Sequence, residues 1–169
     1  NSSINLIDIN YKQEKAFQKI SNKSNDYIKN SFNIALYLIN KGISNKLING
    51  PISKKNFLGK KFLGITEYLA HKTKTKNFAM LIYNRNLSVC PLTTHLPIKK
   101  VSKRINKSLI KEKIKLIDVF FKQHLNQKAK MAITGLNPHC ESIDDFNEDE
   151  KIIKPTIKSM IKLNYKIYG

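Results

Sequence analysis

Segments with helical periodicity alternate along this chain with short apolar runs, and this alternation restricts the fold more than any other feature. Apolar residues recur at three- and four-residue spacing over 28–39 and again over 110–121, which predicts two amphipathic helices. The apolar runs within 78–92 and 130–134 have the length and composition of strands. Because helices that alternate with strands pack as layers on a sheet, we predict the α/β class, an α/β sandwich with a mixed sheet.

Capping and turn residues mark the ends of several predicted elements. The first helix can begin at Ser24 or Asp26, both suitable N-caps, and Gly42 stands where a C-cap glycine belongs. Pro155 stands either in the first turn of the last helix or at a kink within it. The other predicted strands are 46–48, 130–134 and a hairpin of strands 78–83 and 87–92 that turns at 84–86. The other predicted helices are 66–73 and 107–123, the second with a buried stripe of Ile110, Ile114, Ile117 and Phe121. The last predicted helix carries Ile153, Ile157, Met160 and Ile161.

The formal net charge of +19 bears on the possible partners of the chain. The chain has 31 lysines and arginines and 12 acidic residues, and such an excess of positive charge is typical of nucleic-acid-binding proteins. Only Arg85 and Arg104 are arginines, however, and arginine is the residue best suited to bidentate phosphate and guanine contacts. We therefore expect no nucleic-acid partner, although a basic nucleic-acid-binding module is the alternative from another functional class. The charge would also help to attract an anionic substrate.

Neither a membrane segment nor a disulfide framework is indicated by the sequence. No apolar run reaches the roughly 18–20 residues that span a bilayer, and the chain does not open with a secretory signal. Cys90 and Cys140 are far apart and lack metal-binding spacing, so both are expected to be reduced thiols. We expect a cytoplasmic protein without a membrane partner. Because the chain begins with Asn1 instead of Met, we also expect a fragment.

Two histidines stand in loops that directly follow predicted strands. His95 lies in the loop 93–97 and His139 in the loop 135–139, and each loop contains a proline. Ligands collect at the carboxyl ends of strands in open α/β sheets, and neutral imidazole is a common ligand of divalent metals. Each residue can equally be an ordinary loop histidine. Two ligands also fall one short of the three that catalytic metal sites usually take from protein.

Three further features could take part in anion or metal binding. Lys54 follows a Gly-Pro turn after a predicted strand, where a cation can meet phosphate or carboxylate. Thr66 opens a predicted helix, and its hydroxyl could serve an anion or simply cap the helix. Six of the 12 acidic residues follow His139 within eleven positions, and they are Glu141, Asp144, Asp145, Glu148, Asp149 and Glu150. We expect Glu148 to Glu150 to cap a helix, and the others could orient a metal-binding histidine.

Five short segments, in this order over 50–155, resemble the PdxA family of 4-hydroxythreonine-4-phosphate dehydrogenases. The segments are Gly50-Pro51-Ile52-Ser53-Lys54, Gly64-Ile65-Thr66-Glu67, Met80-Leu81, Thr93-Thr94-His95-Leu96-Pro97 and Gly135-Leu136-Asn137-Pro138-His139. The family's later Glu-Glu and Ile-x-Pro elements are echoed by Asp149-Glu150 and Ile153-Lys154-Pro155. The segments around the two histidines are the most specific pair.

The resemblance implies a fold and a partial site. The implied fold is a three-layer α/β/α sandwich like that of isocitrate and isopropylmalate dehydrogenases, in a homodimer. Residues 1–169 would cover the central metal- and substrate-binding region, with the N-terminal and C-terminal parts of the family fold absent. His95 and His139 match two metal ligands, and a second subunit supplies the third. Thr66 matches a substrate-contacting threonine, and Lys54 matches the lysine of the family's Gly-Pro-x-x-Lys loop.

The resemblance also implies a reaction. A divalent metal (zinc, magnesium or cobalt) would lower the pKa of the substrate hydroxyl, which favours hydride transfer to NAD and then loss of CO2. The implied substrate is 4-phosphooxy-L-threonine, a small phosphorylated amino acid, in the biosynthesis of pyridoxal 5'-phosphate. Ile65 stands where the family usually has a histidine that contacts substrate. A related dehydrogenase of another phosphorylated hydroxy acid, such as phospho-erythronate, is therefore the alternative within the enzyme class. We expect the fragment to be inactive alone.

Overall fold

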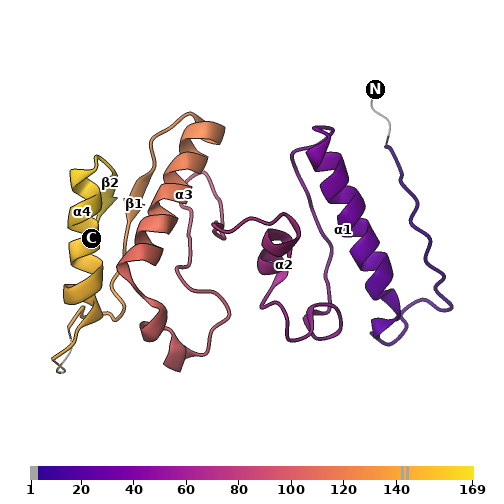
Figure 1. Cartoon of the computed structure of the whole chain (residues 1–169), viewed down its shortest axis with the longest axis horizontal. Coiled ribbons are helices and arrows are strands. Elements are labelled where there is room, and N and C mark those ends of the chain that lie inside the picture. The colour runs from indigo at the N-terminus through magenta and orange to yellow at the C-terminus, as the bar shows by residue number, and fades with distance from the viewer. Residues whose placement is uncertain (1–3, 142, 144) are drawn as a thin grey trace. The chain divides into compact units, whose positions relative to one another are not determined.

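A computed structural model describes residues 4–141, 143 and 145–169 of the chain (Figure 1). It divides into two compact units, Asn1–Tyr68 and Leu69–Gly169. None of the helices in the described part of the chain has both the length and the apolar character that a bilayer-spanning helix needs.

The first unit is built around helix α1, Asn25–Asn40, which confirms the first predicted helix. Ser24 occupies the N-cap position without a capping hydrogen bond from its side chain, and Asp26 lies in the first turn. At the other end Gly42 has a φ of 72°, and the N–H groups of Gly42 and Ile43 donate to the carbonyls of Ile39 and Leu38 at 2.9 and 3.0 Å. This is the paired bonding of a Schellman motif, so the predicted C-cap glycine is confirmed.

An aromatic cluster forms the core of the first unit. Phe32 of α1 lies 5.3 Å from Tyr68, measured between ring centroids, and Phe57 lies 5.2 Å from Tyr68. Phe57 belongs to a short π-helix, Lys54–Leu58, and Asn25 donates a hydrogen bond to the carbonyl of Asn56 at 2.9 Å. These contacts attach the Lys54 turn to the start of α1.

The predicted strand at 46–48 does not form. Ile48 is 96% exposed, and no strand within the described residues of this unit pairs with the segment. A strand gains stability from the ladder and from burial of one face, and this segment has neither.

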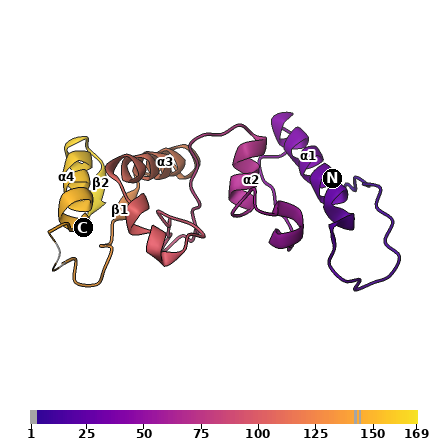
Figure 2. The same cartoon turned by 60° about the horizontal axis from the view of Figure 1, so that its bottom comes forward.

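The second unit contains helix α3, Lys107–Leu125, two short strands and helix α4, Lys154–Lys162 (Figures 1 and 2). The side chain of Asn106 caps α3 by accepting a hydrogen bond from the N–H of Leu109 at 2.9 Å. Ile110 and Ile114 are buried, and Ile117 and Phe121 pack against the core, which confirms the predicted stripe. The core of the unit is completed by Ile105, Ala129, Met131, Ile153, Ile157, Met160 and Ile167.

Strands β1, Lys130–Ala132, and β2, Lys166–Tyr168, pair in parallel, with Met131 opposite Ile167. Strand β1 lies inside the predicted strand 130–134, whereas β2 was not predicted. Pro155 stands in the first turn of α4, which decides between its two predicted positions. A parallel pair needs a crossover connection, and α4 lies within the connection from β1 to β2.

The structure confirms the α/β class, and it does not confirm the three-layer sandwich or the mixed sheet. The only sheet among the described residues is the parallel pair of β1 and β2. The predicted hairpin is reduced to one antiparallel bridge between Ile82 and Val89, with N–H to carbonyl distances of 2.8 and 2.9 Å. Ile82 is 60% exposed and Val89 is 52% exposed, so the two paired residues bury little apolar surface. Without such burial, a ladder of short strands gains little stability.

Candidate functional site

His139 stands on a tight turn that its own sequence stabilises. The N–H of Cys140 donates to the carbonyl of Asn137 at 3.2 Å, which closes a turn with Pro138 and His139 at its centre. The side-chain oxygen of Asn137 accepts a hydrogen bond from the N–H of His139 at 3.0 Å, and its amide donates to the carbonyl of Glu141 at 3.0 Å. Asparagine favours such turns because its side chain bonds to nearby backbone, and proline favours them because its ring fixes φ. The imidazole of His139 is therefore held on the surface by an ordered turn.

Asp149 and Asn147 connect this turn to the beginning of the last helical segment. Asp149 is 2% exposed, and its Oδ1 accepts a hydrogen bond from the N–H of Leu136 at 3.1 Å. Asn147 accepts hydrogen bonds from the N–H groups of Asp149 and Glu150 at 2.8 and 3.3 Å. Its amide donates to the carbonyl of Cys140 at 3.3 Å. The loop that carries His139 is thus bonded at both its start and its end.

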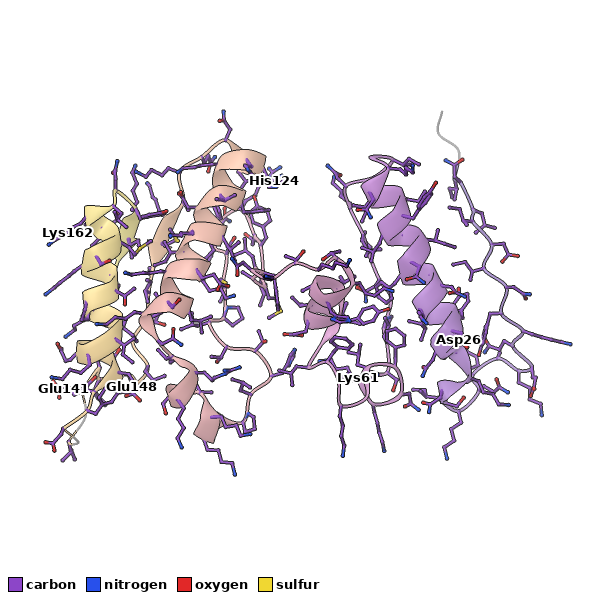
Figure 3. All side chains as sticks on the ribbon, in the orientation of Figure 1. Asp26, Lys61, His124, Glu141, Glu148 and Lys162 are labelled. Carbon is purple, nitrogen blue, oxygen red and sulfur yellow. The ribbon has the colours of Figure 1, made fainter. Side chains whose placement is uncertain are left out.

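Asp149 and Glu150 lie in the first turn of this segment, as predicted for the acidic cluster, but the capping hydrogen bonds come from another residue. Glu148 occupies an N-cap position without a capping bond from its side chain, and Asn147 caps the segment instead. An amide oxygen two residues before a free N–H has the geometry that capping needs. Glu150 pairs with Lys154 one turn later, and this hydrogen bond lowers the pKa of Glu150. Figure 3 shows Glu141 and Glu148 on the loop that leads into α4, at the end opposite Lys162. Asp144 lies outside the described residues.

His95 stands in a strained backbone conformation. Its φ is +51°, in the left-handed region that few residues other than glycine adopt, and its side chain is exposed. Two 3-10 turns follow it, Ile98–Lys100 and Ser102–Arg104, before Asn106 caps the start of α3. Such strain persists only where the surrounding structure fixes it, and it is found often at ligand-binding positions.

Lys113 connects α3 to the segment that leads into the His95 loop. Its Nζ donates to the carbonyl of Phe78, lies 5.6 Å from the centroid of the Phe78 ring, and pairs with Glu112 at 3.0 Å. Burial raises the pKa of the Cys90 thiol, and the nearby Lys113 charge lowers it by a smaller amount. Sequence reasoning did not identify Lys113, because an attachment to a backbone carbonyl 35 residues away has no local pattern.

The imidazoles of His95 and His139 are suitable ligands for a divalent metal, but two ligands are fewer than a catalytic metal site usually takes from protein. Both are exposed, and neither makes a hydrogen bond or ion pair with any residue that the structure describes. Over 4–141, 143 and 145–169, no group of three or more His, Cys, Asp or Glu side chains could hold a metal ion. The residues present therefore fit a metal that takes its remaining ligands from elsewhere.

The two predicted substrate residues belong to the first unit and its boundary. Lys54 is the exposed first residue of the π-helix Lys54–Leu58, whose start is capped by Ser53. The hydroxyl of Ser53 donates to the side-chain oxygen of Asn56 at 2.8 Å. Thr66 is half-buried in the first turn of helix α2, Ile65–Lys72. Free N–H groups at such a helix start are suited to an anion.

A family comparison covers the entire chain. The family model described as "Pyridoxal phosphate biosynthetic protein PdxA" matches residues 1–169. A 4-hydroxythreonine-4-phosphate dehydrogenase of Sulfurihydrogenibium sp. (strain YO3AOP1) is 34% identical over 161 residues, which are 93% of this chain and 49% of that protein. A D-threonate 4-phosphate dehydrogenase of Pectobacterium atrosepticum is 29% identical over 126 residues, which are 73% of this chain and 39% of that protein.

A solved structure agrees with these sequence matches. The 4-hydroxythreonine-4-phosphate dehydrogenase of Klebsiella pneumoniae superposes with a TM-score of 0.77 at 25% sequence identity, over 89% of this chain and 47% of that one. The chain spans about half the length, or less, of the curated relatives it matches.

Proposed function

This chain belongs to the PdxA family of pyridoxal phosphate biosynthetic proteins, and on that premise we propose that it forms the metal- and substrate-binding part of a 4-hydroxythreonine-4-phosphate dehydrogenase. The proposed reaction is the NAD-dependent oxidation, with decarboxylation, of 4-phosphooxy-L-threonine. The observation that carries this proposal is the family match over all 169 residues, which includes both histidine loops.

His95 and His139 are the residues of this chain that would hold the divalent metal. When bound, the metal would act as a Lewis acid that lowers the pKa of the substrate hydroxyl. The chain's own contribution is to present two imidazoles that no described side chain engages, one on a hydrogen-bonded turn and one in a strained loop. A ligand held by ordered backbone loses little conformational entropy when a metal binds, which favours affinity.

Lys54 and Thr66 would bind the anionic phosphate end of the substrate. The Lys54 ammonium is exposed at the start of a short helical segment, and the Thr66 hydroxyl lies in the first turn of α2 beside backbone N–H groups. Both positions offer positive charge or hydrogen-bond donors to phosphate oxygens. The chain's excess of lysine would raise the rate at which such an anion arrives.

A second subunit of the complete enzyme would complete the metal site. Three protein ligands with one open position are usual for a catalytic metal, and His95 and His139 would supply two of them. We therefore propose a homodimer in which a partner provides the third ligand. NAD would be the hydride acceptor of the reaction.

Alanine substitutions in the complete protein test the metal assignment. His95→Ala and His139→Ala are each expected to abolish metal-dependent turnover and to weaken Co2+ binding, measured by absorption titration. His124→Ala is the matched control, because His124 is exposed on α3 and contacts the Phe120 ring instead of either loop. Near-normal turnover in either loop variant would contradict the assignment.

A second substrate is favoured by one of the relatives. The Pectobacterium atrosepticum protein is named a D-threonate 4-phosphate dehydrogenase, and Ile65 removes an imidazole that the family usually places beside Thr66. Another phosphorylated hydroxy acid is therefore the alternative to 4-phosphooxy-L-threonine. The values of kcat/KM for 4-phosphooxy-L-threonine and for D-threonate 4-phosphate decide between them. A tenfold higher value for the latter would reassign the substrate while leaving the metal-dependent oxidation in place.

A further inference from the structure

We infer that Asp149 is a positioning residue, which fixes the conformation of the loop 135–141 and thereby the place of the His139 imidazole. The inference rests on the proposed function only in that it gives His139 a metal to bind. Asp149 itself would contact neither metal nor substrate, because its side chain lies beneath the loop and is 2% exposed.

The contact between Asp149 and the beginning of the loop is close and specific. The carboxylate Oδ1 accepts a hydrogen bond from the N–H of Leu136, which lies 13 positions earlier in the chain. A Cβ placed on Gly135 would stand 2.9 Å from the same oxygen and 2.3 Å from the Sγ of Cys140. Real Cβ atoms do not approach other atoms so closely. Glycine is therefore the residue that lets the loop backbone reach the carboxylate.

From Leu136 the bonding continues directly to His139. Asn137, the next residue, accepts the N–H of His139 at 3.0 Å and donates to the carbonyl of Glu141 at 3.0 Å. Asn147 closes the loop from the other side through the carbonyl of Cys140 and the N–H of Asp149. Asp149 therefore fixes the position where the turn begins, and the turn fixes the backbone of His139.

The carboxylate is well suited to this task. A charged acceptor makes a hydrogen bond roughly twice as strong as a neutral one, and a buried one is costly to leave without a donor. The loop would have to lose its Leu136 bond in order to move, and that would leave a buried charge unsatisfied. The neighbouring Glu150, by contrast, is exposed and pairs with Lys154.

Three substitutions in the full-length protein test this inference. Asp149→Ala removes the acceptor, and Asp149→Asn keeps an oxygen in place but removes the charge. Asp145→Ala is the matched control, because it removes an exposed carboxylate from the segment between this loop and the last helical segment. Hydrogen exchange of the peptide covering 135–141 reports the loop without metal, and Co2+ titration reports the affinity of the site.

In Asp149→Ala we expect amide exchange of the loop to be at least tenfold faster and the Co2+ affinity to be roughly 10- to 100-fold lower, the loss typical when a residue that supports a metal ligand is removed. Asp149→Asn should lie between Asp149→Ala and the unmodified protein, and Asp145→Ala should change neither quantity by as much as twofold. Unchanged exchange in Asp149→Ala would overturn the inference. Faster exchange with unchanged Co2+ affinity, in a protein whose His139→Ala variant loses affinity, would also overturn it.

One further variant, Gly135→Ala, keeps the test decisive. If Asp149→Ala does not fold, Asp149→Asn and Gly135→Ala are judged by the same two measurements, since Gly135→Ala displaces the loop from the carboxylate by contact. If His139→Ala binds Co2+ as tightly as the unmodified protein, the proposed metal role of His139 fails. The exchange of the loop amides then decides alone whether Asp149 holds the loop.

Discussion

Asp118 and Lys122 form an ion pair across one turn of α3, with Nζ and Oδ2 2.6 Å apart, although one side chain is buried and the other is mostly exposed. The Asp118 side chain is 5% exposed and that of Lys122 is 57% exposed. Within the described residues the second oxygen of Asp118 is buried without a hydrogen-bond partner. The lysine therefore reaches back from solvent to neutralise a carboxylate on the buried side of the helix.

We predict that this pair makes stability fall in alkaline solution. The hydrogen bond to Asp118 is the largest cause that raises the pKa of Lys122 above its ordinary value of 10.5. A raised pKa in the folded state means that the contribution is fully present below that ordinary value and is lost as the pH rises through the folded pKa. Lys122→Met should lower the melting temperature at pH 8, and the difference from the unmodified protein should shrink above pH 10.5.

Lys115→Met is the control for this prediction, because Lys115 is exposed on the same helix and makes no ion pair among the described residues. Melting curves recorded between pH 7 and 11.5 provide the measurement. A constant difference between Lys122→Met and the unmodified protein across that range would contradict the role of the pair.

We predict that Ile157 and Ile161 differ sharply in their effect on stability, although both stand on α4. Ile157 is 3% exposed in the core of the second unit, whereas Ile161 is 48% exposed. Ile157→Ala should lower the free energy of unfolding by about 2–5 kcal/mol, because it removes buried methyl groups and leaves a cavity. Ile161→Ala should cost clearly less, since part of its surface already contacts water. Urea denaturation measures both, and equal losses would show that the core is packed differently.

We predict that Cys90 reacts slowly with alkylating reagents at neutral pH. Burial is the main cause that raises the pKa of its thiol, so a smaller fraction is thiolate, the reactive form, than in an unfolded chain. In a Cys140→Ser variant, Cys90 is the remaining cysteine, and its rate with iodoacetamide at pH 7.5 should increase when urea unfolds the protein. A rate in the folded state equal to that in urea would show that the thiol is neither buried nor protonated more than usual.

Local sequence patterns were sufficient to predict the helices. The three- and four-residue spacing of Ile110, Ile114, Ile117 and Phe121 defined the buried side of α3, because a helix places such residues on one face whatever it packs against. Gly42 was likewise interpreted correctly from its position, since its backbone preference is a property of a single residue. For Pro155 the sequence left two positions open, and the structure places it in the first turn of α4.

Strand pairing could not be predicted in the same way, since it depends on partners that are distant in sequence. The runs around Ile82 and Val89 have strand composition, yet they form one bridge, and both bridged residues stay largely exposed. Strand β2 was not predicted, because its three residues form a strand only through the ladder with β1, which no local pattern shows.

The sequence by itself determined the family and the two loop histidines, because short motifs in a fixed order are preserved in the residues themselves. Only the tertiary structure decided which acidic residue supports His139. Six carboxylates follow that histidine, and sequence position favoured helix capping for Asp149. Its burial and its bond to the N–H of Leu136 arise because the chain folds back over 13 residues, a long-range contact that no local pattern encodes.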